Sequence, residues 1–137
     1  IDINKEEQQV ALLNLKYFGL EKQIILKIEN AERLSFADHS FDLIFSINVF
    51  HHLNNPSVVL NQILRLLRPG GKVVLSDFNA KGLEIINACH AHEGRVHDHS
   101  RHSLSEARDY FFRSDFSIKE FQSAAQEILV AQPGKGN

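Results

Sequence analysis

Two apolar runs rich in branched and aromatic side chains, Phe41–Phe50 and Lys72–Asp77, constrain the fold most strongly. A single amphipathic helix pattern separates them, with Val59, Ile63 and Leu66 at helical spacing. Hydrophobic strands that alternate with helices are typical of a parallel sheet covered on both faces. Such sheets bind ligands at the carboxyl ends of their strands. Polar residues that follow these two runs are therefore the first candidates for function.

The rest of the sequence completes an α/β order of elements. Asn4 and Ser103 are predicted helix N-caps, with Glu7 and Glu106 completing capping boxes, and Gly19 is a predicted helix end. Val10, Leu13 and Tyr17 are predicted on the inner face of the first helix, and Pro69-Gly70-Gly71 makes the turn into the strand 72–77. The predicted elements up to residue 77 are a strand end at 1–3, a helix to about 18, strands 24–28 and 41–47, a helix from 56 and a strand 72–77. They are followed by a helix from about 81 to 90, a helix that is capped by Ser103 and runs to about 113, and an antiparallel hairpin of 116–121 with 127–131.

Length and charge bound the class of protein. The chain has 137 residues, which fits one domain over 1–132 followed by a frayed tail at 133–137. A net charge of -2 provides no broad basic field, so we expect no nucleic acid partner. No apolar run approaches the roughly 18 residues that span a bilayer, and a single cysteine, Cys89, suits a reducing compartment. We therefore expect a cytoplasmic protein with no membrane partner.

Four segments, in this order and at these intervals, resemble the class I S-adenosylmethionine-dependent methyltransferases. The resemblance is closest to the small-molecule group that includes the ubiquinone and menaquinone methyltransferases. It implies a Rossmann-like doubly wound sheet with a C-terminal hairpin, S-adenosyl-L-methionine as cofactor, and a small-molecule methyl acceptor. The segments are IDIN at Ile1–Asn4, NAERLSFADHSFD at Asn30–Asp42, SINVFHHL at Ser46–Leu53 and LLRPGGKVVLSD at Leu66–Asp77.

The family's first strand and its Gly-rich loop have no counterpart in this sequence, which also contains no methionine. Without that central strand, its two neighbours would carry unpaired backbone groups that cost about 1 to 3 kcal/mol each. We therefore expect residues upstream of Ile1 in the natural protein. The alternative is a homodimer in which a second copy donates the strand.

The resemblance implies a set of cofactor-binding residues. A carboxylate just past a strand end can accept both ribose hydroxyls, which favours Asp2 with its neighbour Ile3. Asn30 and Ala31 match the segment beside the adenine, and Ser46 and Ile47 match the strand end that passes the methionine part of the cofactor. Each has a structural alternative: a solvated charge or helix cap for Asp2, an ordinary loop amide for Asn30, and core packing for Ile47.

His51 and His52 are the candidate catalytic residues, because imidazole near neutral pH can take a proton from an acceptor hydroxyl or orient it. Asn48 beside them is a candidate substrate contact. Methyl transfer also gains much from alignment alone, so packing roles for these three residues stay open.

A second cluster of histidines with one cysteine follows at residues 89–102. Its spacing matches no established metal pattern, so no metal is assigned. We interpret it as a lid in which His97 contacts substrate, with a metal site or a plain surface loop as alternatives. Its members are Cys89, His90, His92, His97, His99 and His102.

Three functions are compatible with the sequence. The first is transfer of a methyl group from S-adenosylmethionine to a small molecule. The second is a non-catalytic interaction or regulatory module on the same fold, without a complete cofactor site. The third is a dinucleotide dehydrogenase, which is disfavoured by the hairpin and by the motifs around Asn30 and Pro69.

Overall fold

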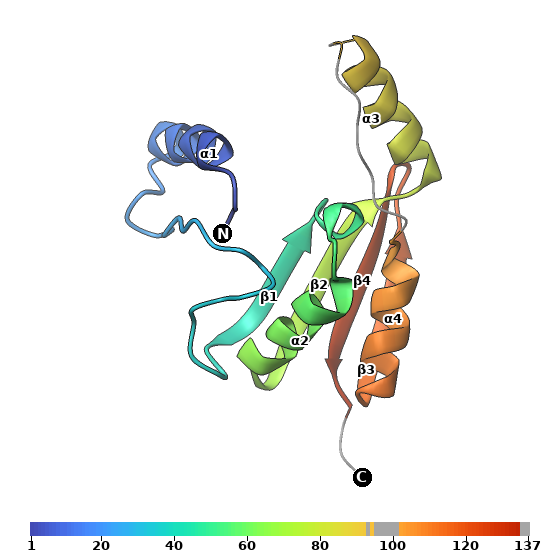
Figure 1. Ribbon diagram of the computed structural model, residues 1–137. Coiled ribbons are helices and arrows are strands. Elements are labelled where there is room, and N and C mark those ends of the chain that lie inside the picture. The colour runs from blue at the N-terminus through green and yellow to red at the C-terminus, as the bar shows by residue number, and fades with distance from the viewer. Residues whose placement is uncertain (93, 95–101, 135–137) are drawn as a thin grey trace. The chain divides into compact units, whose positions relative to one another are not determined.

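A computed structural model describes residues 1–92, 94 and 102–134 of the chain. It divides the chain into two compact units, an N-terminal unit, Ile1–Phe36, and a C-terminal unit, Ala37–Asn137. Figure 1 labels the helices and strands of both units.

The N-terminal unit contains one helix, α1, over Lys5–Phe18. Its start was predicted correctly, because Asn4 Oδ1 accepts the backbone N–H of Glu6 at 2.8 Å. The backbone N–H of Asn4 is donated to Asp2 Oδ1 at 2.8 Å, in place of the predicted capping-box bond to Glu7. Gly19 ends the helix with φ 67°, in the left-handed region that the prediction required.

The prediction for the inner face of α1 was wrong. Val10, Leu13 and Tyr17 are 54%, 65% and 83% exposed. The other side of the helix, which carries Leu15, lines a hollow together with Ile24. Because α1 has apolar residues on two sides, helical spacing alone did not identify the side that packs within this unit.

The strand predicted at Ile24–Ile28 is reduced to one parallel bridge between Asp2 and Ile28. Its two hydrogen bonds run from Asp2 N to Lys27 O and from Glu29 N to Asp2 O, both at 3.0 Å. A bridge of this kind aligns the two segments in the same direction. Asp2 and the residues after Ile28 therefore lie at the same end of the pair.

The C-terminal unit is built on a sheet of four strands in the order β1-β2-β4-β3. Strand β1 pairs parallel with β2, and β4 pairs antiparallel with both β2 and β3 (Figure 1). The predicted hairpin is confirmed, and it places the last strand between two earlier ones. The strands are β1, Phe41–Ile47; β2, Leu67–Phe78; β3, Phe116–Gln122; and β4, Gln126–Pro133.

Strand β2 begins at Leu67, five residues before the predicted Lys72. The register between β1 and β2 shifts there, because Phe41 pairs with Leu67 whereas Leu43 pairs with Lys72. The predicted turn residues are therefore an irregular stretch inside a strand, where Gly70 supplies the positive φ of 80°.

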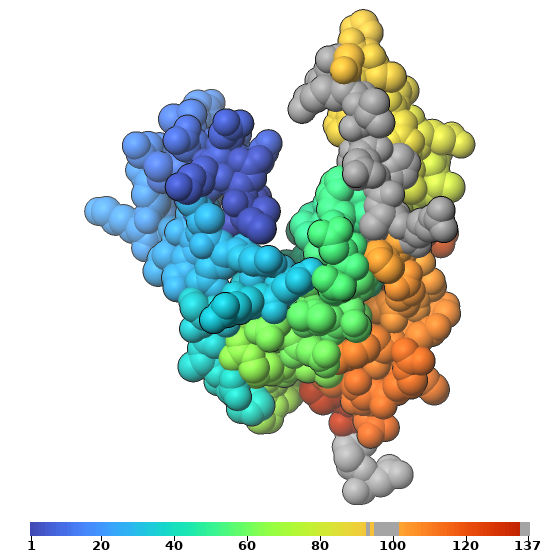
Figure 2. All heavy atoms as spheres, viewed as in Figure 1, coloured from blue at the N-terminus to red at the C-terminus, as the bar shows by residue number. Residues whose placement is uncertain are grey.

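Helices α2, Pro56–Leu66, and α4, Leu104–Arg113, cover one face of this sheet. Figure 2 shows their side chains side by side, in green and orange. The start of α2 at Pro56 and its apolar stripe were predicted correctly. The core beneath the helices is formed by buried residues of α2, α4, β2 and β4, among them Leu60, Ile63, Val73, Leu75, Ala107, Phe111, Leu129 and Ala131.

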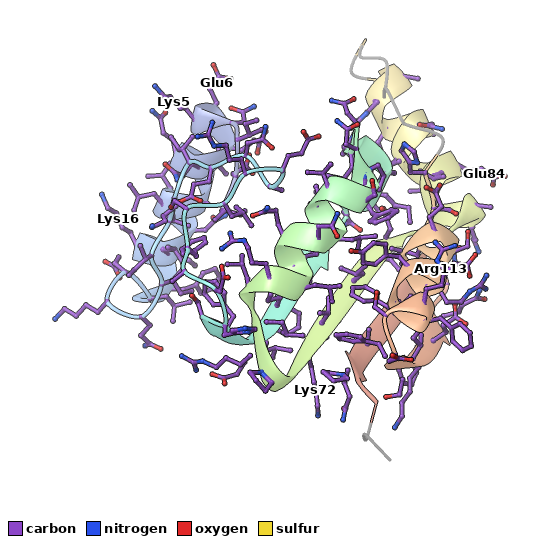
Figure 3. All side chains as sticks on the ribbon, turned by 60° about the horizontal axis from the view of Figure 1, so that its bottom comes forward. Lys5, Glu6, Lys16, Lys72, Glu84 and Arg113 are labelled. Atoms are coloured by element: carbon purple, nitrogen blue, oxygen red, sulfur yellow. The ribbon has the colours of Figure 1, made fainter. Side chains whose placement is uncertain are left out.

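The other face of the sheet is also apolar, and its β1 side chains are exposed. Leu43, Phe45 and Ile47 of β1 are 45%, 60% and 56% exposed. Phe45 is in register with Val74, which is in register with Val130, so the three side chains share this face. Charged side chains such as Lys72, Glu84 and Arg113 project from the periphery of the unit (Figure 3).

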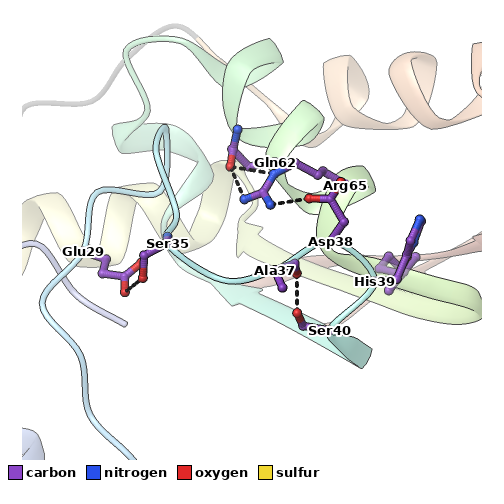
Figure 4. Close-up of polar contacts among 9 residues, drawn as sticks. Glu29, Ser35, Ala37, Asp38, His39, Ser40, Gln62 and Arg65 are labelled. Carbon is purple, nitrogen blue, oxygen red and sulfur yellow. Dashed lines mark hydrogen bonds and ion pairs between the residues drawn. The ribbon is translucent and has the colours of Figure 1, made fainter.

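Ion pairs fasten the loop that leads into the amino end of β1. Arg65 Nη1 lies 2.7 Å from Asp38 Oδ1 and its Nη2 donates to Gln62 Oε1 at 2.8 Å (Figure 4). Arg68 pairs with Asp42 in the same way at 2.6 Å. This cluster lies at the end of β1 opposite to Ile47, so it serves the loop rather than a ligand site at the carboxyl ends.

Helix α3, Ala80–His92, follows β2 and packs closely on the turn of the hairpin through Gly82. The predicted tail is held at its start, because Pro133 belongs to β4 and Gly134 N donates to Asp115 O at 2.8 Å. Residues 135–137 lie outside the described part of the chain. Among the described residues, no helix is both long enough and apolar enough to cross a membrane.

Candidate active site

The predicted cofactor residues Asp2, Ile3, Asn30 and Ala31 belong to the N-terminal unit. The parallel bridge of Asp2 with Ile28 places Asp2 and Asn30 at the same end of two adjacent segments. This is the arrangement that a shared adenosine site requires. Asp2 is exposed, and its Oδ1 caps the N–H of Asn4, which leaves Oδ2 for a ligand.

Asn30 makes a local turn, in which its Oδ1 accepts the N–H of Glu32 at 2.9 Å. Its backbone carbonyl accepts the N–H of Arg33 at 2.9 Å. The side chain therefore has the loop-amide role that was the alternative to cofactor binding. These bonds use oxygen atoms only, and the Asn30 amide nitrogen remains a suitable donor to a ring edge.

Glu29, directly before Asn30, is an acidic residue held by hydrogen bonds within this loop. Its two carboxylate oxygens accept the N–H and the hydroxyl of Ser35, at 2.9 and 2.6 Å (Figure 4). The hydrogen bonds from Ser35 hold the pKa of Glu29 below its usual value, with a smaller contribution from Lys27. Glu29 thus fixes the loop 29–35 that carries Asn30 and Ala31.

Ser46, Ile47, Asn48, His51 and His52 lie at or directly after the carboxyl end of β1 in the C-terminal unit. Ser46 is half-buried, whereas Ile47 is 56% exposed and is not packed in the core of the unit. Asn48 follows with φ 54°, a left-handed conformation that asparagine tolerates better than most residues. Its N–H donates to Ser76 O at 2.8 Å, which continues the pairing with β2.

The loop after β1 is anchored by Phe50, which is 2% exposed, within the short 3₁₀ helix η1, Phe50–His52. This turn directs His51 inward and leaves His52 exposed. The two imidazole rings remain in contact, with centroids 3.9 Å apart.

His51 is held by Asp77, the residue near the carboxyl end of β2. Asp77 Oδ1 lies 2.5 Å from His51 Nδ1, and Oδ2 accepts the backbone N–H of His51 at 2.8 Å. The N–H of Phe78 also donates to Asp77 Oδ1, at 2.8 Å. Both partners are buried, with His51 5% and Asp77 6% exposed. A carboxylate that accepts at Nδ1 makes Nδ1 the protonated ring nitrogen, so the basic lone pair resides on Nε2.

Asp77 was missed as a functional residue in the sequence. The available signal was its position, since it ends a buried strand at the same sheet edge as His51. A second polar group was missed as well, because Gln126 at the start of β4 donates to Asn48 Oδ1 at 2.9 Å. Ser76 in turn donates its hydroxyl to Gln126 Oε1.

The proposed lid is only partly described. His97 and His99 lie outside the described residues, so the expected substrate contact of His97 has no structural description. His90 and His92 belong to α3, and His102 Nδ1 lies 2.9 Å from Glu106 Oε2. Within the described ranges, no three histidine, cysteine or acidic residues are grouped as a metal site would require.

Comparison with known proteins identifies the class to which this geometry belongs. Residues 1–75 match the family described as "Methyltransferase domain", so the chain belongs to this methyltransferase family. The cofactor that this membership indicates is S-adenosylmethionine.

Two relatives illustrate the range of the family. The chain is 30% identical over 81 residues to methyltransferase GfsG from Streptomyces halstedii, covering 59% of this chain and 29% of that protein. It is 33% identical over 86 residues to the ubiquinone/menaquinone biosynthesis C-methyltransferase UbiE from Pseudoalteromonas translucida, covering 63% and 34%. The chain thus spans about a third of the length of each of these relatives.

A solved structure supports the fold. A SAM-dependent methyltransferase from Methanosarcina mazei superimposes with a TM-score of 0.66 at 21% identity, covering 97% of this chain and 80% of that one. The Rossmann-like class expected from the sequence is therefore confirmed.

Proposed function

We propose that the protein transfers the methyl group of S-adenosylmethionine to a hydroxyl group of a small-molecule acceptor, with His51 as the general base. The family supports methyl transfer in general. The choice of a hydroxyl acceptor rests on one observation, the two hydrogen bonds between His51 and the carboxylate of Asp77. A base fixed in this way is of most use when the acceptor must lose a proton.

In the proposed step, the acceptor oxygen attacks the methyl carbon while the bond from this carbon to the sulfonium sulfur breaks. The hydroxyl proton passes to His51 Nε2, and S-adenosylhomocysteine leaves as a neutral thioether. Asp77 holds the ring in one orientation and stabilises the imidazolium that forms, without taking the proton itself. The burial of the pair limits competition from water for the base.

Cofactor binding is proposed for Asp2 and Asn30, with Ile3 and Ala31 as neighbours. The exposed Oδ2 of Asp2 would accept the ribose hydroxyls, and the Asn30 amide would contact the adenine edge. Ser46 and Ile47 are proposed to contact the methionine part of the cofactor. His52 is proposed as a second acceptor contact, since it is exposed and touches the ring of His51.

The test separates cofactor binding from chemistry. Calorimetric titration of the protein with S-adenosylhomocysteine should give a saturable signal in the wild type and in His51→Gln, and a weaker one in Asp2→Ala. Incubation with methyl-labelled S-adenosylmethionine and a panel of phenols and alcohols should label a small molecule in the wild type only. Absence of binding in the wild type, or equal labelling by His51→Gln, would refute the proposal.

A further inference from the structure

Asn48 and Gln126 are 78 residues apart in the sequence and are joined side chain to side chain at the carboxyl edge of the sheet. Gln126 comes from the hairpin, whereas Asn48 belongs to the loop that carries His51. The contact therefore connects the last strand of the chain to the proposed acceptor end of the site.

Two hydrogen bonds run in the same direction, from Ser76 to Gln126 and from Gln126 to Asn48. Ser76, 7% exposed, donates its hydroxyl to Gln126 Oε1, which turns Gln126 Nε2 toward Asn48. Nε2 then donates to Asn48 Oδ1 at 2.9 Å. One of the two acceptor sites of Asn48 Oδ1 is thereby occupied within the protein, whereas the side-chain NH₂ of Asn48, a pure donor, is left to bind a ligand.

The backbone of Asn48 is fixed in the same place. Its N–H donates to Ser76 O, and its φ of 54° lies in the left-handed region. The residues on either side, Ile47 and Val49, are apolar and yet 56% and 40% exposed. A donor flanked by exposed apolar side chains suits an apolar molecule that carries a carbonyl or ether oxygen.

We propose that Gln126 is a positioning residue that fixes the orientation of the Asn48 side-chain amide. We further propose that the acceptor molecule is apolar and presents a hydrogen-bond-accepting oxygen to Asn48 Nδ2. This inference rests on the proposed function, because it assigns Asn48 to the acceptor. Gln126 acts through Asn48 and does not itself touch the acceptor.

Gln126→Glu tests the orientation of the Asn48 amide directly. The carboxylate still accepts the Ser76 hydroxyl, so the hydrogen bond between Ser76 and residue 126 is preserved. It cannot donate to Asn48 Oδ1, and it favours the reversed amide, with Nδ2 turned inward and Oδ1 turned outward. The variant therefore changes the group presented to the ligand while keeping the side-chain length.

The probe is acetophenone, with ethylbenzene as the matched molecule that lacks the oxygen. In the isotope-labelled protein, acetophenone should shift the side-chain NH₂ resonances of Asn48, and ethylbenzene should not. Gln126→Glu should weaken the acetophenone response by roughly tenfold or more, the effect of one lost hydrogen bond. Gln23→Glu, the same change at an exposed turn of the N-terminal unit, should leave it unchanged.

Asn48→Asp provides a second variant that does not depend on the folding of Gln126→Glu. Aspartate still accepts from Gln126 and tolerates the left-handed backbone, but it offers no NH₂. Acetophenone affinity, followed through the backbone amides of residues 47–49, should fall as in Gln126→Glu.

Two results would overturn the inference. One is the absence of any response at Asn48 in the wild type up to the solubility limit of acetophenone. The other is an equal response in the wild type and in both variants. Titration with S-adenosylhomocysteine is run on the same samples, and if it binds to none of them, the proposed function fails whatever the probe shows.

Discussion

The carboxylate of Asp77 contacts His51 twice, once at the ring nitrogen Nδ1, 2.5 Å away, and once at the backbone N–H, 2.8 Å away. The ring contact sets the tautomer and the backbone contact sets the position of the loop. A single residue of β2 thus controls both the chemical state and the location of the proposed base.

Asp77→Asn should therefore lower methyl transfer strongly while leaving cofactor binding intact. The amide can donate to Nδ1 and so favours the wrong tautomer, with the proton on Nε2. We expect a loss of about 10²- to 10⁴-fold in the rate of methyl transfer, as for removal of a general base. The measurement is single-turnover labelling of the acceptor found in the panel, with calorimetry of S-adenosylhomocysteine as the control.

Asp77→Ala tests stability at the same position. It removes the acceptor that Asp77 provides to His51 Nδ1 and to two backbone N–H groups, and breaking a buried pair costs about 3 to 5 kcal/mol. Equilibrium unfolding in urea should show this loss in the free energy of unfolding. A loss below about 1 kcal/mol, the typical net contribution of one ordinary hydrogen bond, would mean that the pair contributes little to folding.

Gly82→Ala sets two effects against each other. Alanine in a helix is favoured over glycine by about 1 kcal/mol. However, a Cβ at residue 82 would lie 2.1 Å from the backbone oxygen of Ala125. A backbone atom cannot move aside as a flexible side chain can, and overpacking costs about 1 to 3 kcal/mol.

We therefore expect Gly82→Ala to lower the free energy of unfolding in urea. The matched control is Ala88→Gly on the exposed side of the same helix, which should cost about 1 kcal/mol through helix propensity alone. A stabilised Gly82→Ala protein would show that α3 does not pack on the hairpin turn as described.

Tyr110 should ionise at unusually high pH. Burial raises the pKa of Tyr110 above its ordinary value of 10.0, and its hydroxyl donates to Asn61 Oδ1. Because the folded-state pKa is raised, the stability that it contributes is present below pH 10 and is lost as the pH rises through the folded-state value. The chain has two tyrosines, so Tyr17→Phe leaves Tyr110 as the sole phenol for an ultraviolet titration. A midpoint at or below 10 would contradict the prediction.

Glu29 should respond to pH in the opposite sense. Its pKa is lowered by the hydrogen bonds from Ser35, so its contribution to stability is present above the unfolded-state value and is lost as acid protonates it. Ser35→Ala removes the side-chain bond and should raise the pKa of Glu29 toward 4.5, as measured by carbon NMR of the carboxyl group. Ser117→Ala, in the C-terminal unit, should leave this titration unchanged.

Local signals predicted local structure well. The start of α2 at Asn55 and Pro56 was correct because proline at the first helical position loses no hydrogen bond. The apolar stripe of Val59 and Ile63 is buried as predicted, because residues four positions apart lie on the same side of a helix. The face of α1 that carries Leu13 was wrong, because two apolar stripes satisfy the same periodicity and only tertiary packing chooses between them.

In the candidate site, too, local features were predicted from the sequence, whereas contacts between distant residues were not. His51 and Asn48 were predicted because they follow a strand end in a motif. Their partners Asp77 and Gln126 lie 26 and 78 residues away, and the contacts depend on strand order and register. Register is set by packing of whole strands, so neither pairing could be predicted from sequence spacing.

The strand order β1-β2-β4-β3 has a consequence for synthesis. When β3 has been translated, it cannot yet join the sheet, because β4 pairs with both β2 and β3 and must lie between them. The sheet can therefore close only after residues 126–133 have left the ribosome, and until then the edge of β2 is open to wrong partners. Strand β3 therefore cannot take its final position before β4 has been made, which makes the pairing of this hairpin with β2 a late folding event.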